Sequence, residues 1–157
     1  MKCPIEGVVA RSITRHSDNR GWLAELFRQD ELPADLHPVM SYMSMTRPGV
    51  TRGPHEHSEQ TDIFCFLGPS TFRLYLWDNR PASNAPRTPD FAADFGEGNP
   101  ALVSVPPGVV HAYQNIGKVD GFVFNAPNRL FMGQGRKEPV DEVRYEGCPD
   151  SPFLFGE

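Results

Sequence analysis

Sixteen prolines and fourteen glycines are spread along the whole chain of 157 residues, and they divide it into short segments. Proline interrupts a helix by removing a backbone donor, and glycine weakens one through its conformational freedom, so long helices are not expected. Strand patterns recur instead, at residues 7–14, 21–28, 39–46, 61–67, 71–78, 101–105, 109–114 and 121–125. The sequence therefore predicts an all-β protein, a sandwich or barrel of short strands, with the jelly roll among the candidates.

The segments between these strands are expected to be turns, loops and one short helical stretch. One or two helical turns are predicted at residues 30–36, where Pro33 interrupts them. Gly68-Pro69-Ser70 predicts a hairpin turn, and the proline-rich stretch at 79–99 predicts a long loop with room for a short strand at 91–95.

The end of the chain differs in character from the rest. After Pro127 the sequence becomes irregular and charged, and we expect it to fold as a tail over one face of the barrel. No internal repeat and no second pattern of elements is visible, so residues 1–157 are interpreted as a single domain.

Charge and cysteine content narrow the function classes. The chain has 15 basic and 20 acidic residues and no basic run, which argues against nucleic acid and anionic membranes as partners. Cys3, Cys65 and Cys148 are scattered without a CxxC spacing, so a disulfide framework is not expected. No stretch has the apolar length of a membrane span or a signal peptide. These features predict a cytoplasmic protein.

Three of the five histidines lie in two segments about fifty residues apart. His55 and His57 are separated by one residue, so in an extended strand their side chains point to the same face. Arg52 and Glu56 would then lie on the other face if the strand is regular. His111 can join the pair only if a barrel brings the distant strands together. Such a group of imidazoles can bind a metal ion or move protons near neutral pH.

Both segments match signatures of the cupin superfamily. The upstream signature, Gly-x5-His-x-His-x4-acid, is matched at Gly49, His55, His57 and Asp62. The downstream signature, Pro-x-Gly-x2-His-x3-Asn, is matched at Pro106, Gly108, His111 and Asn115. The resemblance implies a cupin jelly-roll β-barrel with short helical turns, and it says much less about the reaction.

A narrower resemblance covers most of the chain. The motifs Asp-x-Arg-Gly-x3-Glu-x-Phe-Arg from Asp18, Arg-Gly-x-His from Arg52 and Pro-Gly-x2-His from Pro107 are similar to those of dTDP-4-dehydrorhamnose 3,5-epimerases. The resemblance implies that Arg20, Glu25 and Arg52 help to hold a nucleotide-sugar, chiefly its diphosphate. It also implies that His55 is the catalytic base and that the protein is a homodimer.

The chain departs from the epimerase pattern at several positions. Asp62 stands where the epimerases have a lysine, and Phe124 aligns with their catalytic tyrosine, the acid on the opposite face of the sugar. Met40 and Tyr42 stand at the positions of a substrate-binding glutamine and asparagine, and both are interpreted as wall residues. The carboxylate that orients the base lies C-terminally in the family, which leaves Asp141 and Asp150 as candidates. Because a phenyl ring cannot donate a proton, these departures favour proton movement on one face of the sugar.

Two other groups of relatives fit the histidines as well. The dTDP-sugar 3,4-ketoisomerases resemble this chain in Asp-x-Arg-Gly and in Arg-Gly-x-His-x-His, where two imidazoles on one face can pass a proton between adjacent carbons. Metal-dependent cupins instead use residues such as His55, His57, Asp62 and His111 as ligands. Tyr113, two residues beyond His111, faces the same side in a regular strand and is a nearby phenol.

These patterns favour one function and leave two open. We expect an isomerase-type enzyme that acts on a dTDP-4-keto-6-deoxy sugar without a cofactor. The expected catalytic residues are His55, His57 and His111, and the expected substrate-binding residues are Arg20, Glu25, Arg52 and Tyr113. The first alternative is a metal-dependent cupin with one divalent zinc, iron or manganese ion. The second is a sugar-binding cupin that has lost catalysis.

Overall fold

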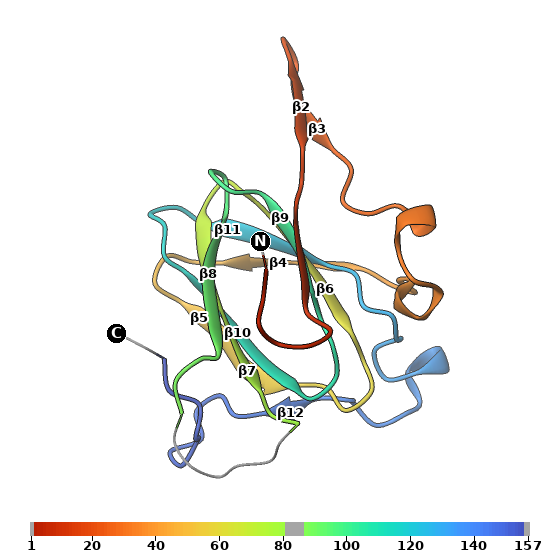
Figure 1. Ribbon diagram of the computed structural model, residues 1–157, viewed down its shortest axis with the longest axis vertical. Helices are drawn as coiled ribbons and strands as arrows, with labels where there is room; N and C mark the ends of the chain where they lie inside the picture. Colours follow the sequence, from red (N-terminus) through yellow and green to blue (C-terminus); the bar gives the residue numbers. More distant parts are fainter. Residues whose placement is uncertain (1, 81–86, 156–157) are drawn as a thin grey trace.

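The computed structural model describes residues 2–80 and 87–155, and its framework is two antiparallel five-stranded sheets that face each other (Figure 1). The first sheet contains, in spatial order, β1 (Val9–Ser12), β9 (Ala101–Val105), β6 (Asp62–Gly68), β11 (Gly121–Asn125) and β4 (Tyr42–Thr46). The second sheet contains β12 (Val143–Arg144), β5 (Thr51–Glu56), β10 (Val109–Asn115), β7 (Thr71–Asp78) and β8 (Phe91–Gly96). This arrangement confirms the predicted all-β jelly roll.

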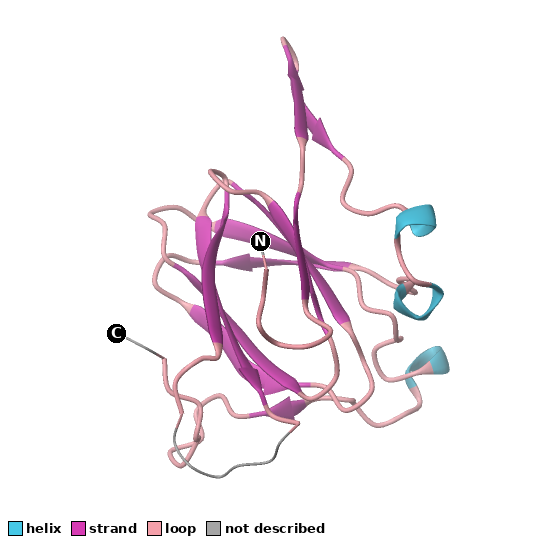
Figure 2. Cartoon of the chain, viewed as in Figure 1, coloured by secondary structure: helices cyan, strands magenta, loops and turns pink. Residues whose placement is uncertain are grey.

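Helical structure is limited to single turns, as the proline and glycine content predicts (Figure 2). The predicted helical stretch forms two 3₁₀ turns, η1 (Gln29–Glu31) and η2 (Ala34–Leu36), on either side of Pro33. A third turn, η3 (Gln134–Arg136), lies in the C-terminal tail. Within 2–80 and 87–155, no helix is long and apolar enough to cross a membrane.

The main core lies between the two sheets. Phe64 and Phe66 of β6 point inward from the first sheet, and Leu74 of β7 and Tyr113 of β10 point inward from the second. All four are nearly or fully buried. Because successive residues of a strand alternate between faces, the intervening residues point outward. Burying large aromatic side chains from both sheets supplies most of the hydrophobic stabilisation of the barrel.

Both outer faces of the barrel are covered by other parts of the chain. Leu26 and Leu32, from the segment after the N-terminal strands, pack with Cys65 on the outside of the first sheet. On the outside of the second sheet, the ring of Phe153 in the C-terminal tail lies 5.6 Å from that of Trp77. The tail therefore folds over one face of the barrel, as predicted.

Two local predictions differ from the structure. Gly68-Pro69-Ser70 does not close a hairpin, because β6 belongs to the first sheet and β7 to the second, and the segment crosses between them. The predicted long loop at 79–99 contains the expected short strand, β8, but residues 81–86 lie outside the described residues. A turn composition alone does not tell which sheet the next strand joins.

Among the described residues, the N-terminal hairpin has no partner strand in its own barrel. It consists of β2 (Arg15–Asp18), which sequence reasoning missed, and β3 (Gly21–Ala24), and these pair only with each other. It projects away from the two sheets (Figure 1). Two large apolar side chains on it are exposed, Trp22 by 52% and Leu23 by 64%.

Candidate active site

The pairing of β5 with β10 brings two of the predicted histidines face to face. His55 pairs with His111, whereas Arg52 pairs with Tyr113, so β5 has one extra residue between the two pairs. Gly53 lies at this irregularity with a φ of +91°, a conformation that favours glycine. A Cβ atom there would collide with the carbonyl oxygen of His111. The bulge therefore depends on Gly53, and it sets which side chains meet at the centre of the barrel.

The three predicted histidines form one cluster. The ring centroids of His55 and His111 are 4.4 Å apart, and the ring of His57 lies 5.9 Å from each of them. His111 is 1% exposed and His57 is 9% exposed. The structure thus confirms that the barrel brings the two histidine segments together.

Asp62 of β6 completes this cluster from the opposite sheet. One of its oxygens, Oδ2, lies 3.2 Å from the Nε2 atom of His57 and 3.2 Å from that of His111. The other, Oδ1, accepts hydrogen bonds from Gln60 and Asn125, each at 2.9 Å. Burial alone would raise the pKa of Asp62, but its contacts with the two imidazoles outweigh burial and hold that pKa well below the usual range. Asp62 is therefore a buried carboxylate anion.

The backbone orients two of the imidazoles toward this anion. The Nδ1 atom of His111 donates to the carbonyl oxygen of Val109 at 3.0 Å, and Nδ1 of His57 is bonded to the carbonyl oxygen of Asp141. Both rings therefore direct Nε2 toward Asp62. Burial lowers the pKa of His57, but the Asp62 carboxylate raises it more, and the net shift is upward. His57 is the imidazole of this group that Asp62 stabilises in its protonated form.

His55 lies between two glutamates of the C-terminal tail. Its Nδ1 atom is 3.5 Å from Glu146 Oε1, and its Nε2 atom is 3.8 Å from Glu142 Oε1. The same oxygen of Glu146 accepts a 2.5 Å hydrogen bond from the backbone of Gly53. Burial lowers the pKa of His55 to about 2, with the charges of His111 and His57 adding to the effect. The imidazole of His55 is therefore neutral near neutral pH.

The carboxylates beside His55 are therefore not the two predicted from the sequence. Asp141 instead accepts backbone hydrogen bonds from Ser58, Glu59 and Gln60 at 2.9, 3.0 and 2.9 Å. Asp150 lies on the exposed surface of the tail. The prediction failed because the tail has no periodic pattern, so the sequence does not show which acid reaches the barrel. The short strand β12 pairs with β5, and this pairing places Glu142 and Glu146 beside His55.

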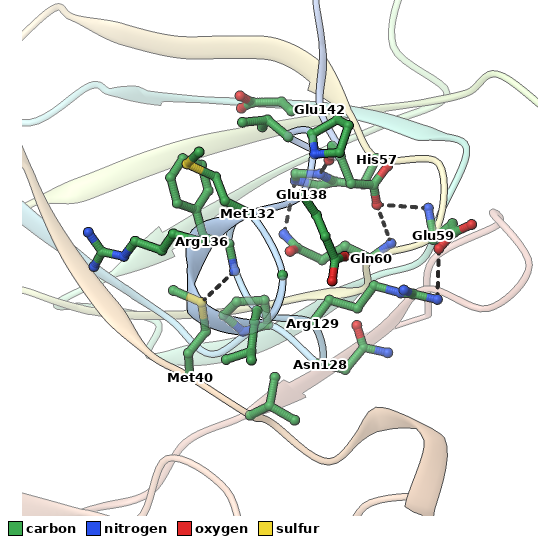
Figure 3. Close-up of a pocket in the computed structure, with 18 of the residues that line it drawn as sticks. Met40, His57, Glu59, Gln60, Asn128, Arg129, Met132, Arg136, Glu138 and Glu142 are labelled. Carbon is green, nitrogen blue, oxygen red and sulfur yellow. Dashed lines mark hydrogen bonds and ion pairs between the residues drawn. The ribbon is translucent and has the colours of Figure 1, made fainter.

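A cavity of about 1220 Å³ opens beside the cluster (Figure 3). The residues that line it include Tyr42, His57 and Gln60, and most of the others belong to the segment 127–144, among them Glu142. Three arginines line it: Arg129, Arg136 and Arg144. Arg129 is paired with Glu59 and Arg144 with Glu142, and within the described chain Arg136 has no ion pair. The cavity is large enough for a small-molecule ligand with an anionic part.

Two of the predicted substrate-binding residues, Arg52 and Tyr113, lie on the strands that carry His55 and His111. Arg52 donates from Nε to Thr46 Oγ1 and from Nη2 to the carbonyl oxygen of Met45, each at 2.9 Å, and so ties β5 to β4. The hydroxyl group of Tyr113 lies 2.9 Å from Ser44 Oγ. The ring of Phe64 lies 5.3 Å from His111 and 5.7 Å from Tyr113, which confirms that these two residues share a face.

Arg20 and Glu25 lie outside the cluster. Arg20 is paired with Asp18 at the exposed tip of the N-terminal hairpin, at 2.5 Å. Glu25 is paired with the neighbouring Arg28, at 3.7 Å. Within one chain, no described contact brings either residue to the histidines. Their assignment to the substrate stays a prediction.

Comparisons with known proteins identify the family. The family model described as dTDP-4-dehydrorhamnose 3,5-epimerase matches residues 2–132. The chain belongs to this family. Its members are epimerases and related isomerases, so the protein is an isomerase-type enzyme.

Individual relatives agree with this assignment. The chain is 36% identical over 129 residues to the probable low-salt glycan biosynthesis epimerase Agl13 of Haloferax volcanii, covering 81% of each protein. It is 35% identical over 114 residues to the spore coat polysaccharide biosynthesis protein SpsL of Bacillus subtilis, covering 73% of this chain and 74% of that one. Its fold is similar to that of the dTDP sugar isomerase from Desulfovibrio desulfuricans, with a TM-score of 0.78 at 21% identity, covering 98% and 94% of the chains.

The structure shows how this chain departs from the epimerase pattern. Phe124, at the position of the family tyrosine, packs in the cluster on the outside of the first sheet and does not face the histidines. Its neighbour Asn125 is buried and points inward, where it bonds to Asp62. Asn125 also donates a 2.7 Å hydrogen bond to the hydroxyl oxygen of Tyr42. The sequence analysis interprets Tyr42 as a wall residue, and Tyr42 does line the cavity.

Glu56, which is expected on the face of β5 opposite the histidines, is 9% exposed and accepts hydrogen bonds from Asn79 at 2.9 Å and from Tyr145 at 2.5 Å. These partners lie on the outside of the second sheet, which confirms that Glu56 and the histidines are on opposite faces of β5.

The donor atoms of the cluster also fit the metal alternative. His55, His57, Asp62 and His111 each offer one ligand atom, and these atoms lie within 4.8 Å of one another. Asp62 Oδ2 and His111 Nε2 are buried without a well-aligned hydrogen-bond partner in the described chain. Three imidazoles and a carboxylate suit zinc, iron or manganese.

Proposed function

We propose that this enzyme moves a proton at a carbon next to the ketone of a dTDP-4-keto-6-deoxy sugar, with His55 as the general base and without a metal. Membership of the family supports the reaction class. The observation that carries the proposal is the placement of His55 between Glu146 and Glu142, the second of which lines the cavity. Two carboxylates at one imidazole are expected for a histidine that receives and passes on protons.

Glu146 is the group that can select the nitrogen that acts. Its Oε1 atom lies 3.5 Å from Nδ1 of His55, which has no well-aligned hydrogen-bond partner in the described chain. If Glu146 accepts the Nδ1 proton when the substrate is bound, the Nε2 atom keeps its lone pair and can take a proton from the sugar carbon. Glu142, 3.8 Å from Nε2, then stabilises the imidazolium that forms. The proton leaves the carbon as the C–H bond breaks, and the electron pair moves to the ketone oxygen as an enolate. His57, whose pKa is raised, assists by placing positive charge beside this oxygen, and His111 assists by packing against the ring of His55.

The diphosphate is proposed to lie against Arg52, with Tyr113 on the same wall of the barrel. Two donors of Arg52 bind β4, and the guanidinium has other donors that can bind a phosphate. We also propose a homodimer in which the N-terminal hairpin of one subunit reaches the partner. The projection of this hairpin supports the idea, because Arg20 and Glu25 then reach a sugar site only through a second copy.

The biological setting follows from the relatives and from the cysteines. The relatives with glycan and polysaccharide names support a role in carbohydrate biosynthesis. Cys3, Cys65 and Cys148 are all free thiols, which supports the reducing cytoplasm.

Turnover of a dTDP-4-keto-6-deoxy sugar tests the proposal. The wild type should convert it to an isomer of the same mass, and His55→Ala should lose at least about a hundredfold in kcat, the usual contribution of a positioned base. His37→Ala is the matched control, since the side-chain hydrogen bonds described for His37 join it to Gln29 and Leu32 and not to the cluster. An inactive wild type, or an active His55→Ala, would contradict the proposal.

The convergence of Asp62 Oδ2 and His111 Nε2 supports a second candidate, the metal-dependent cupin. His55, His57, Asp62 and His111 would hold the ion, and the ion would act as a Lewis acid toward a ligand oxygen. Metal analysis of tag-free protein distinguishes the two candidates. One zinc, iron or manganese per chain, with activity lost on chelation, would favour the second.

A further inference from the structure

Three charged residues alternate along the part of the tail that lies opposite His55. Glu142, Arg144 and Glu146 are each two positions apart, and Arg144 of β12 is paired directly with His55 of β5. In an antiparallel sheet, directly paired side chains lie on the same face, and so do those two residues further along. The imidazole of His55 therefore has a carboxylate on each side. All three tail residues lie beyond residue 132, where the match to the family model ends.

The two carboxylates compete for one proton of His55. Burial lowers the pKa of His55 to about 2, and nearby positive charges, Arg144 among them, add to this effect. The neutral ring has a single N–H group and a single lone pair. Glu146 Oε1 lies 3.5 Å from Nδ1, and Glu142 Oε1 lies 3.8 Å from Nε2. Neither distance is that of a short hydrogen bond, so the proton is drawn to the carboxylate that keeps more of its negative charge.

Arg144 offsets the charge of only one of these carboxylates. Its Nε atom donates a 2.7 Å hydrogen bond to Glu142 Oε2, and this contact raises the pKa of Arg144. Arg144 is 66% exposed, but the Glu142 side chain is 14% exposed, so water screens this pair less than one between two exposed groups. Glu146 instead accepts an N–H group from Gly53, and in the described chain its only ion-pair contact is with His55. Glu146 therefore attracts the ring proton more strongly than Glu142 does.

We propose that Arg144 is a positioning residue, which keeps the proton of His55 on Nδ1 and leaves Nε2 free to act as the base. The inference rests on the proposed function. With Arg144 in place, the N–H group of the ring faces Glu146. The lone pair of Nε2 then takes the proton from the sugar carbon as the C–H bond breaks, and the electron pair moves to the ketone oxygen. Without Arg144, the full charge of Glu142 draws the ring proton to Nε2, and this nitrogen has no lone pair left for the sugar.

The position of the ring proton can be measured without turnover. Protein with isotope-labelled histidine, stripped of metal by a chelator, is studied by nuclear magnetic resonance at neutral pH. The chemical shifts of the two ring nitrogens distinguish the N–H group from the nitrogen with the lone pair, and the His55 signals are those missing from His55→Ala. We expect the Nδ1–H form in the wild type and the Nε2–H form in Arg144→Gln. The kcat of Arg144→Gln should fall by at least about tenfold, a part of the roughly hundredfold or greater contribution of a positioned base.

Further variants separate the charge of Arg144 from its packing. Arg144→Lys keeps the positive charge and should keep the Nδ1–H form and most of kcat. Arg144→Gln combined with Glu142→Gln removes the competing carboxylate and should return the proton to Nδ1. Arg73→Gln is the matched control, since Arg73 forms an ion pair with Asp94 on the outside of the second sheet, and it should behave as the wild type. Circular dichroism checks the fold of each variant, and Arg144→Met replaces Arg144→Gln if that variant is unfolded.

The outcomes separate this inference from the proposed function. Nδ1–H in the wild type and Nε2–H in Arg144→Gln, with return to Nδ1–H in the double variant, support the inference. Nε2–H in the wild type would overturn it. The same tautomer in Arg144→Gln as in the wild type would also overturn it, even with a lower kcat, because Arg144 would then only attach the tail to the barrel. If the proton moves as expected but the wild type does not turn over a dTDP-4-keto-6-deoxy sugar, the proposed function fails while the control of the ring proton by Arg144 is supported.

Discussion

At the scale of single residues, the site depends on one buried charge. Asp62 is fully buried, and its partners are two imidazoles and two amide groups from different parts of the chain. The carboxylate therefore connects β6 with β10 and β11 and with the loop after β5. Removing only the charge would leave an imidazolium without its partner, which is more costly than removing both.

Asp62→Asn is accordingly expected to lower the free energy of unfolding by roughly 3 kcal/mol, the typical cost of breaking a buried ion pair. Urea denaturation followed by tryptophan fluorescence would measure it. Glu59→Gln is the matched control, because Glu59 forms an exposed pair with Arg129, and such pairs contribute about 0–1 kcal/mol. Equal stabilities of the two variants would show that Asp62 is not the charged centre described above.

Arg52 allows a prediction about the ligand. Arg52→Ala should weaken the binding of thymidine diphosphate by about 1.5–3 kcal/mol, as expected when a hydrogen bond to a charged group is lost. Isothermal titration calorimetry would show this. Arg73→Ala provides the control, since Arg73 pairs with Asp94 on the outside of the second sheet. Unchanged affinity in Arg52→Ala would show that the diphosphate does not bind at Arg52.

At the scale of elements, the least regular part of the chain completes the site. β12 has two residues, yet it pairs with β5 and brings Glu142 and Glu146 to His55. Asp141 holds the start of this segment by binding the backbone of the loop at 58–60. The tail is thus attached to the same loop that carries His57.

Asp141→Ala should release this attachment. Three backbone donors lose their charged acceptor, so we expect a loss of roughly 1–3 kcal/mol in stability and a lower kcat because Glu142 is displaced. Thermal unfolding and steady-state kinetics would measure the two effects. Asp150→Ala, on the exposed tail, serves as the control. A stable but inactive Asp141→Ala would show that the attachment of the tail through Asp141 serves catalysis more than folding.

The element scale also shows what the sequence can predict. The strands and the meeting of His55, His57 and His111 are predictable, because short alternating segments and two spaced motifs carry local information. The crossing from one sheet to the other at Gly68-Pro69-Ser70 and the approach of Glu146 to His55 are not predictable. Both depend on which distant strand a segment pairs with. The hydrogen bond between Asn125 and Tyr42 is likewise not predictable, because it depends on the pairing of β11 with β4, which are far apart in the sequence.

At the scale of the whole molecule, the N-terminal hairpin is the element that stands apart from the two sheets in the described chain. The hairpin exposes Trp22 and Leu23 and pairs with no strand of its own barrel. An isolated two-stranded hairpin is marginally stable in water, so a packing partner is expected. In the proposed homodimer this partner is a second copy, and Arg20 at the tip reaches the partner's site.

Light scattering tests this arrangement. The wild type should have about twice the 17.6 kDa mass of one chain, and Trp22→Glu combined with Leu23→Glu should shift it toward the monomer and weaken thymidine diphosphate binding. Charged residues at Met43 on β4, which is 66% exposed, would show whether that edge is part of the contact. A monomeric wild type would contradict the dimer and leave Arg20 without a role at the site.

The central claim is that His55 moves a proton without a metal, and one measurement addresses it directly. Protein stripped of metal by a chelator is incubated in heavy water with a dTDP-4-keto-6-deoxy sugar, and nuclear magnetic resonance follows deuterium entering the carbons beside the ketone. We predict incorporation by the stripped wild type and none above background by His55→Ala. No incorporation by the stripped wild type, with recovery when zinc, iron or manganese is returned, would contradict the claim.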